Sequence, residues 1–305
     1  MTGNVAPGPS VTDRRVLRRL SEFVDRDAEM EKFCAVLGGA EQAIMVVHGE
    51  TGMGKTSLLM RMIHECSLRK MPKAEVVWSD SNPHDYIAVM RKVREAFGAE
   101  YFTAFTDLIN YYTDAQYHPK LEITLQLPGS ISVAAGMNIE NSTVGDIAGV
   151  ILRDNMFVVP RADLGVPEAQ RREELTKRFL LGLKLASLNS PIAVFFDATE
   201  KMSDDTRAWL WEQLLDSVRN GVLANVRFVL CGQQRPPQDR DWEIYIQTAA
   251  LSPLGLDDIV AYLAKRIPAL EESARVPSAK FILELTKGLP VNVAASVDGF
   301  LKSEK

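Results

Sequence analysis

Three glycines, a lysine and a threonine stand close together near the start of the chain. Gly49, Gly52, Gly54, Lys55 and Thr56 match the spacing G-x-x-x-x-G-K-[ST] in full. Because glycine tolerates positive φ, such a loop can turn several backbone N–H groups toward one point. Donors arranged in this way bind phosphate, and the lysine and hydroxyl that follow can contact terminal phosphates and Mg²⁺. The spacing therefore predicts a loop that binds the phosphates of a nucleotide.

The segments on both sides of this loop fit the same prediction. Ala43–His48 is a short apolar run, typical of a strand buried on both faces. The residues that follow Thr56 have helical periodicity, and the free N–H groups and dipole of a helix N-terminus favour anions. We expect nucleotide contacts from Gly49, Thr51, Gly52, Met53, Gly54, Lys55, Thr56 and Ser57.

An aspartate far along the chain is the predicted partner of this loop. Asp197 ends the apolar run Ile192–Asp197, which is typical of a buried strand. A carboxylate in that place is costly unless it serves a cation or a hydrogen-bond network. Asp197 and Thr56 are therefore the predicted ligands of Mg²⁺. The alternative is that Asp197 caps the turn that follows.

Hydrolysis needs further polar groups near the terminal phosphate. Ala198 offers no chemistry, whereas Glu200 is a candidate for orienting the attacking water. The alternative for Glu200 is a solvated side chain in the first turn of a helix. After the predicted strand 226–231, Gln233 and Arg235 are candidates for contacting the γ-phosphate, and an exposed loop arginine is the alternative for Arg235. The predicted catalytic residues are Lys55, Asp197, Glu200 and Arg235.

Strand and helix patterns alternate along most of the chain, which predicts a three-layer α/β/α fold around a parallel sheet. We expect a partly disordered N-terminal arm over residues 1–22 and a core over residues 23–250. Residues 98–165 are rich in Ile, Val, Thr and Gly, and Leu121–Leu127 alternates with a period of two, which predicts a hairpin-rich insertion. Residues 251–305 show only helical patterns and form the predicted lid domain.

Charge and composition limit the classes of partner. The 305 residues are 46% hydrophobic and carry a net charge of −5, so no global basic field attracts nucleic acid or an anionic membrane. One basic cluster, Arg14, Arg15, Arg18 and Arg19, is either a solvated helix face or a DNA contact. The sequence contains no run of about 18 apolar residues, so we expect no membrane span.

The cysteines indicate a reducing compartment. Cys34, Cys66 and Cys231 match no metal-site spacing, and all three stand in apolar surroundings. The N-terminus is polar and lacks the apolar core of a signal peptide. Together these features predict a cytoplasmic protein.

Four separate segments carry a resemblance to one class of protein. They are FVDRDAEMEKF, which begins at Phe23, GETGMGKTS, IAVFFDATEK and LTKGLPVNVAAS. The chain resembles the STAND class of P-loop NTPases, with its NB-ARC and NACHT relatives, and the neighbouring AAA-type and origin-recognition ATPases. The resemblance implies an adenine wall at Phe23, Val24 and Arg26 and a lid contact from Pro290 in the G-x-P motif. It also implies ATP or ADP with Mg²⁺ as cofactors.

Three departures from that class imply slow rather than fast hydrolysis. Asp25 stands where the class has glycine, Ala198 stands where glutamate is frequent, and the arginine after the sensor strand is displaced to Arg235. The winged-helix domain that follows the lid in this class is not seen before Lys305. We therefore expect either a fragment or a reduced protein that acts with a partner.

These features favour a slowly hydrolysing, Mg²⁺-dependent ATPase that acts as a switch or oligomerising regulator in signalling or defence. Self-association through Leu121–Ile147, whose low charge favours strand pairing, is one hypothesis, and an effector protein is another. Two alternatives stay open. One is a DNA-transaction ATPase of the initiator or loader kind, and the other is a non-hydrolysing scaffold that its nucleotide stabilises.

Overall fold

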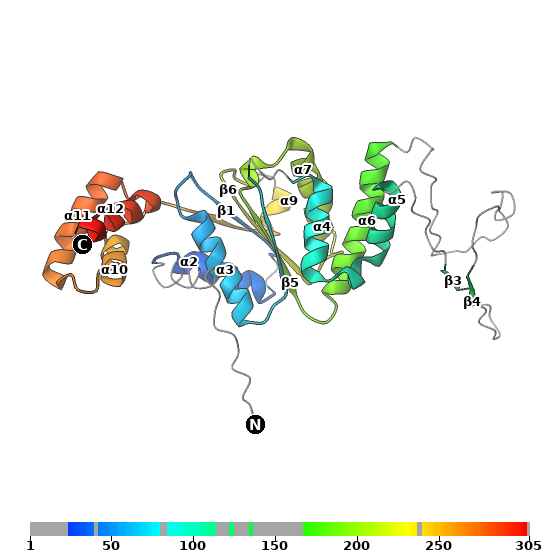
Figure 1. Cartoon of the computed structure of the whole chain (residues 1–305), viewed down its shortest axis with the longest axis horizontal. Coiled ribbons are helices and arrows are strands. Elements are labelled where there is room, and N and C mark those ends of the chain that lie inside the picture. Colours follow the sequence, from blue (N-terminus) through cyan, green and yellow to red (C-terminus); the bar gives the residue numbers. More distant parts are fainter. Residues whose placement is uncertain are drawn as a thin grey trace, which may run out of the picture. The chain divides into compact units, whose positions relative to one another are not determined.

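The computed structural model describes residues 24–39, 42–79, 84–113, 122–124, 134–136, 167–236 and 240–303 (Figure 1). Contacts divide the chain into two units, residues 1–101 with 183–305, and residues 102–182. The predicted arm with its arginine cluster lies outside the described residues.

A parallel sheet of five strands forms the centre of the first unit. Its order is β2 (Lys73–Val77), β5 (Ile192–Asp197), β6 (Val226–Gly232), β1 (Ile44–His48) and β7 (Ile246–Ala250). All neighbouring strands are parallel, so their carboxyl ends meet at one edge of the sheet. This arrangement confirms the predicted α/β fold.

Helices cover both faces of this sheet, because successive residues of a strand point to opposite sides. On one face, Met45, Phe195 and Val229 belong to a buried cluster that α2 and α3 complete. On the other face, Phe196 stacks on Phe228, and α4 and α7 lie on that side of the sheet (Figure 1). The helices of this core are α2 (Asp27–Leu37), α3 (Lys55–Leu68), α4 (Tyr86–Phe97), η3 (Thr199–Lys201), α7 (Asp204–Trp209), η4 (Leu210–Leu215), α8 (Asp216–Arg219) and α9 (Arg240–Glu243).

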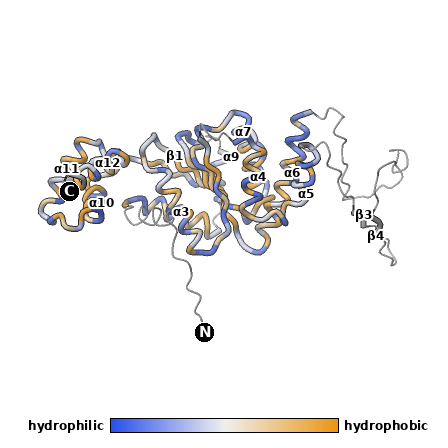
Figure 2. The backbone as a smooth tube through the Cα atoms, in the orientation of Figure 1, coloured by the Kyte–Doolittle hydropathy of each residue, from blue (hydrophilic) through white to orange (hydrophobic). Residues whose placement is uncertain are grey.

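The central strands are apolar at nearly every position, as is typical of strands covered on both faces. Every residue of β5 and β6 is buried, including Asp197 and Arg227. Figure 2 shows the sheet around β1 as largely hydrophobic. The carboxylate of Asp197 is thus an exception that needs a local reason.

The C-terminal part is helical, as predicted. It contains α10 (Leu256–Arg266), α11 (Glu272–Thr286) and α12 (Pro290–Ser303). These helices bury a separate apolar cluster, so their packing does not depend on the core of the sheet. The cluster contains Leu254, Ile259, Leu263, Ala279, Ile282, Val293 and Val297.

The second unit differs from the predicted hairpin-rich insertion at its start. The turn η1 (Ala99–Phe102) leads into the helix α5 (Thr103–Thr113), which packs near α6 (Glu168–Ala186) through Phe105 and Phe179. Phe105, Leu108 and Ile109 are buried and have the spacing of a helix. The prediction missed α5 because it assigned these residues to the same hairpin-rich insertion as the later residues, which are rich in Ile and Val.

One antiparallel pair, β3 (Glu122–Thr124) with β4 (Ala134–Gly136), agrees with the predicted hairpins. The rest of the segment Leu121–Ile147, for which self-association was hypothesised, lies outside the described residues. None of the helices that the structure describes has both the length and the apolar character needed to cross a membrane.

Candidate functional site

The glycine-rich loop joins β1 to α3, as predicted. Gly52 has φ 86° and Gly54 has φ 83°, a left-handed conformation that side chains disfavour. Gly54 is also the N-cap of α3, and its carbonyl accepts the N–H of Leu58 at 3.0 Å. The first free N–H groups of α3 therefore lie directly behind the loop, where an anion binds favourably.

Lys55 lies across this loop. Its Nζ donates to the carbonyl oxygens of Gly49 and Glu50, both at 2.8 Å. These bonds hold a positive charge at the mouth of the loop. Thr56 and Ser57 are exposed there, whereas the side chain of Met53 is buried in the core, so Met53 can meet a nucleotide only through its backbone.

The predicted pair Thr56 and Asp197 does meet, although 141 residues separate the two. Thr56 Oγ1 donates to Asp197 Oδ2 at 3.0 Å, and the N–H of Ala198 donates to Oδ1 at 2.9 Å. Asp197 is 7% exposed, and burial raises the pKa of its carboxyl, with the nearby charge of Glu200 adding to this effect. The hydrogen bonds from Thr56 and Ala198 and the charge of Lys55 act in the opposite direction.

This pair fits a Mg²⁺ ion better than it fits a helix cap. The residue before η3 is Ala198, so Asp197 does not occupy the cap position. Among the described residues no group of three or more His, Cys, Asp or Glu side chains could hold a metal. Mg²⁺ is often bound by only one or two carboxylates together with substrate phosphates, and Asp197 with Thr56 matches that donor set.

Glu200 lies close to the end of β6. Its Oε2 atom is buried and has no hydrogen-bond partner among the described residues. Such an atom is costly unless water or a ligand reaches it. Ala198 has φ 57°, and this left-handed turn brings Thr199 and Glu200 over Gly232. A β-carbon at Gly232 would collide with Thr199 Oγ1 and lie 3.1 Å from Glu200 Oε2.

Gly232 was not singled out in the sequence, because a glycine after a strand is common in loops. Its importance arises from the fold alone: Gly232 is paired with His48 and follows Cys231, which is paired with Asp197. The ends of β1, β6 and β5 therefore lie side by side.

Replacement of Gly232 by alanine is expected to displace Glu200 and to lower the ATP turnover predicted from the sequence roughly tenfold or more, with little change in the predicted affinity for ATP. Steady-state kinetics and calorimetry would measure the two quantities. Gly299→Ala is the matched control, since no atom lies within 4 Å of its added carbon. Equal losses of turnover and affinity would contradict this role.

Gln233 connects the end of β6 to the phosphate loop. Its Nε2 donates to Thr51 Oγ1 at 2.9 Å. Arg235 is exposed and lies near His48, whose pKa is lowered first by burial and then by the charge of Arg235. The structure thus brings Gln233 to the phosphate loop and Arg235 near the end of the strand that precedes the loop.

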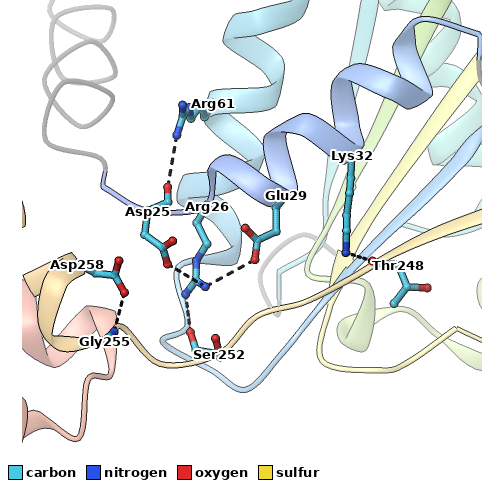
Figure 3. Close-up of polar contacts among 9 residues, drawn as sticks. All are labelled: Asp25, Arg26, Glu29, Lys32, Arg61, Thr248, Ser252, Gly255 and Asp258. Atoms are coloured by element: carbon cyan, nitrogen blue, oxygen red, sulfur yellow. Dashed lines mark hydrogen bonds and ion pairs between the residues drawn. The ribbon is translucent and has the colours of Figure 1, made fainter.

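The predicted adenine-side residues have different positions. Phe23 lies outside the described residues, and Val24 is partly buried at their start. Arg26 is buried and donates from Nη2 to the carbonyl of Ser252 at 2.5 Å (Figure 3). Asp25, which replaces the usual glycine, has φ 63°, so the position demands the left-handed backbone that glycine adopts without strain.

Pro290 begins α12 and lies against the phosphate loop. A β-carbon at Gly54 would lie 3.8 Å from Pro290 Cβ, and the N–H of Val291 donates to the carbonyl of Gly52 at 3.2 Å. Sequence reasoning selected Pro290 but missed Val291, because a backbone N–H leaves no signal in the residue type.

A comparison with protein families finds the AAA ATPase domain over residues 22–229, which is more than half of the chain. The chain belongs to the AAA ATPase domain family. The match of the AAA ATPase domain includes the phosphate loop and Asp197. It confirms the predicted resemblance to AAA-related P-loop ATPases.

Several solved structures are similar to this AAA ATPase chain. Three of them are a HORMA:CdnC:Trip13 complex from E. coli MS115-1, a STAND protein with a tetratricopeptide repeat sensor from Pyrococcus horikoshii, and the ORC2 protein of Aeropyrum pernix. In that order the identities are 10%, 12% and 12%, and the TM-scores are 0.44, 0.42 and 0.37. The alignments cover 90%, 88% and 98% of this chain and 78%, 28% and 70% of those chains. A search of curated proteins gives no match.

Proposed function

We propose that the chain binds ATP with Mg²⁺, hydrolyses it slowly, and uses the bound nucleotide to set the position of its helical lid. The contact between the lid and the phosphate loop carries this proposal. Val291 donates to Gly52 in the middle of the loop, and Pro290 packs near Gly54. A change in the conformation of the phosphate loop alters these contacts with the lid. Nucleotide binding to the loop and the position of the lid are therefore coupled.

Different polar residues of the site contribute to nucleotide binding and to hydrolysis. Lys55 and the N–H groups of the loop bind the phosphates, and Thr56 with Asp197 holds Mg²⁺. When bound, Mg²⁺ neutralises charge that develops on the phosphates. Glu200 is the group that orients water, and its unpaired Oε2 atom supports this role. Gln233 joins β6 to Thr51 and is placed to respond to the terminal phosphate.

Slow turnover is supported by the residue that follows the buried aspartate. Ala198 has no side-chain oxygen, so no second carboxylate stands directly beside Asp197. The nearest acidic residue that follows is Glu200, which lies in the short helix η3. A switch that must stay in its ATP-bound state until a signal arrives needs ATP hydrolysis that is slower than the arrival of that signal.

The most direct experiment identifies the nucleotide that co-purifies with the chain and measures the molar mass with and without that nucleotide. A switch is expected to contain ATP or ADP and to change its mass or partner when the nucleotide changes. Retained nucleotide without turnover would favour a scaffold. Turnover that duplex DNA stimulates, with a steep dependence on salt, would favour a loader.

A further inference from the structure

Arg26, the residue just before α2, has an unusual environment for an arginine. Its side chain is 6% exposed. Nη1 lies 3.3 Å from Asp25 Oδ2 and 3.7 Å from Glu29 Oε1, and Nη2 donates to the carbonyl of Ser252 at 2.5 Å (Figure 3). Two carboxylates thus hold one nitrogen of the guanidinium, while the other nitrogen is aimed at the backbone of a segment 226 residues away.

The backbone that carries Arg26 is strained to reach this geometry. Asp25 and Arg26 both have positive φ, 63° and 76°, which is uncommon for residues with a side chain. Arg61 supports the turn, because its guanidinium donates to the carbonyl of Asp25 and pairs with Asp27 at 2.9 Å. Strain of this kind persists only where surrounding contacts over-determine the conformation.

Ser252 lies in the linker between the sheet and the lid. Immediately before it, the N–H of Leu251 donates to the carbonyl of His48 at the end of β1. Two residues after it, the N–H of Leu254 donates to the carbonyl of Gly288 at 2.8 Å. The linker is therefore attached to the core on one side and to the lid on the other, with Arg26 bound between these two attachments.

The lid end of this path leads directly to the phosphate loop. Gly288 has φ 72°, and a β-carbon there would collide with the carbonyl of Leu254. This close approach fixes the corner that follows, in which Val291 donates to Gly52. One series of contacts thus begins with the side chain of Arg26 on Ser252 and continues through the backbone of the linker and the lid corner to the loop.

We infer that Arg26 is a positioning residue that fixes the linker, and through it holds the lid corner on the phosphate loop. It acts from the core side, and its own side chain need not touch the nucleotide. Its bound carbonyl belongs to the linker backbone, so no substitution at Ser252 can remove that acceptor. The consequence for nucleotide retention rests on the proposed function, whereas the consequence for the lid contact does not.

Amide hydrogen exchange of the whole chain without added nucleotide tests this inference. In Arg26→Gln a shorter, uncharged side chain that still carries N–H donors replaces the guanidinium at the N-cap of α2, so the charged fork is lost. The amides of Leu254 and Val291 are expected to exchange roughly tenfold to a hundredfold faster, as the loss of a buried charge-assisted hydrogen bond implies. The amides of β1 and β6 are expected to keep their rates.

Lys32→Gln is the matched control. Lys32 lies on the same helix and also donates to a backbone carbonyl, that of Thr248 at 3.2 Å, but this acceptor belongs to β7 in the core (Figure 3). The control is expected to leave Leu254 and Val291 unchanged. Arg26→Lys, which keeps one positive charge but cannot serve three partners in a fork, is expected to give an intermediate increase.

Unchanged exchange at Leu254 and Val291 in Arg26→Gln would overturn the inference. An equal increase across β1 and β6 would also overturn it, since it would show a general loss of stability. With a fluorescent ATP analogue, faster dissociation from Arg26→Gln than from the wild-type chain is the expected second result. Failure of the wild-type chain to bind the analogue would refute the proposed function and leave the exchange result intact.

Discussion

Replacement of Lys55 by alanine is expected to weaken ATP binding about a hundredfold or more without unfolding the chain. Among the described residues, the side chain donates to the loop carbonyls of Gly49 and Glu50, and the contact to Glu50 is exposed. Water can replace these bonds, so the loss of stability should be small. Two charge-assisted bonds to phosphate, at roughly 1.5–3 kcal/mol each, account for the loss of affinity.

Isothermal calorimetry with ATP and Mg²⁺ measures this effect. Lys280→Ala is a suitable control, because Lys280 is exposed on α11 and its removal changes the net charge by the same amount. Thermal unfolding of both variants shows whether the fold is kept. An affinity of Lys55→Ala equal to that of the wild type would refute the phosphate site.

Replacement of Asp197 by asparagine should abolish most turnover while sparing most of the binding. Asparagine can keep the contacts that Asp197 makes with Thr56 and with the N–H of Ala198, so the local structure is retained. Asparagine lacks the negative charge that holds Mg²⁺ in the transition state. Loss of one group that stabilises a transition state typically lowers turnover by a factor of about 10²–10³. Asp204→Asn, at an almost fully exposed carboxylate, is the control.

The same substitution should make the chain more stable when metal is removed with a chelator. Burial raises the pKa of Asp197 above its usual value of 3.8, so the folded state favours the protonated form. The native carboxylate therefore costs stability at pH values above its raised pKa, and this cost disappears as pH falls through that pKa toward 3.8. Asp197→Asn is expected to raise the melting temperature by a few degrees at pH 7 and to lose this advantage in acid. A lower melting temperature at pH 7 would contradict the metal-binding role.

Stability and function are thus expected to separate at this position. A residue kept only for structure would lose stability on replacement, whereas a residue kept for a cation gains stability when the uncompensated charge is removed. Measuring the melting temperature and turnover of one variant therefore distinguishes the two roles of Asp197.

Much of the core followed from local patterns. The phosphate loop was predicted because its chemistry is contained in eight consecutive residues, Gly49–Thr56, flanked by an apolar run and a helical pattern. The strand Ile192–Asp197 was predicted with its observed bounds, because an uninterrupted apolar run leaves little choice at a position covered on both faces. Alternation of such runs with helical segments predicted the layered fold.

Where several patterns compete, sequence reasoning was weaker. The helix α5 was missed because its apolar spacing stands next to a segment rich in β-branched residues. Asp25 was recognised as a departure from glycine, but its left-handed backbone was not foreseen. Side chains indicate preferences at such positions, and the surrounding contacts override them.

By itself, the sequence determined that the chain has a phosphate loop, a buried aspartate at the end of a strand, and a helical C-terminal part. These features depend on neighbouring residues and on periodicity, which a linear chain records directly. Only the tertiary structure decided that Thr56 donates a hydrogen bond directly to Asp197, that Gly232 makes room for Glu200, and that Arg26 binds the linker at Ser252. Thr56 and Asp197 are 141 residues apart and meet because parallel strands bring their carboxyl ends to one edge. Arg26 and Ser252 are 226 residues apart and meet where the start of α2 lies beside the linker that follows β7.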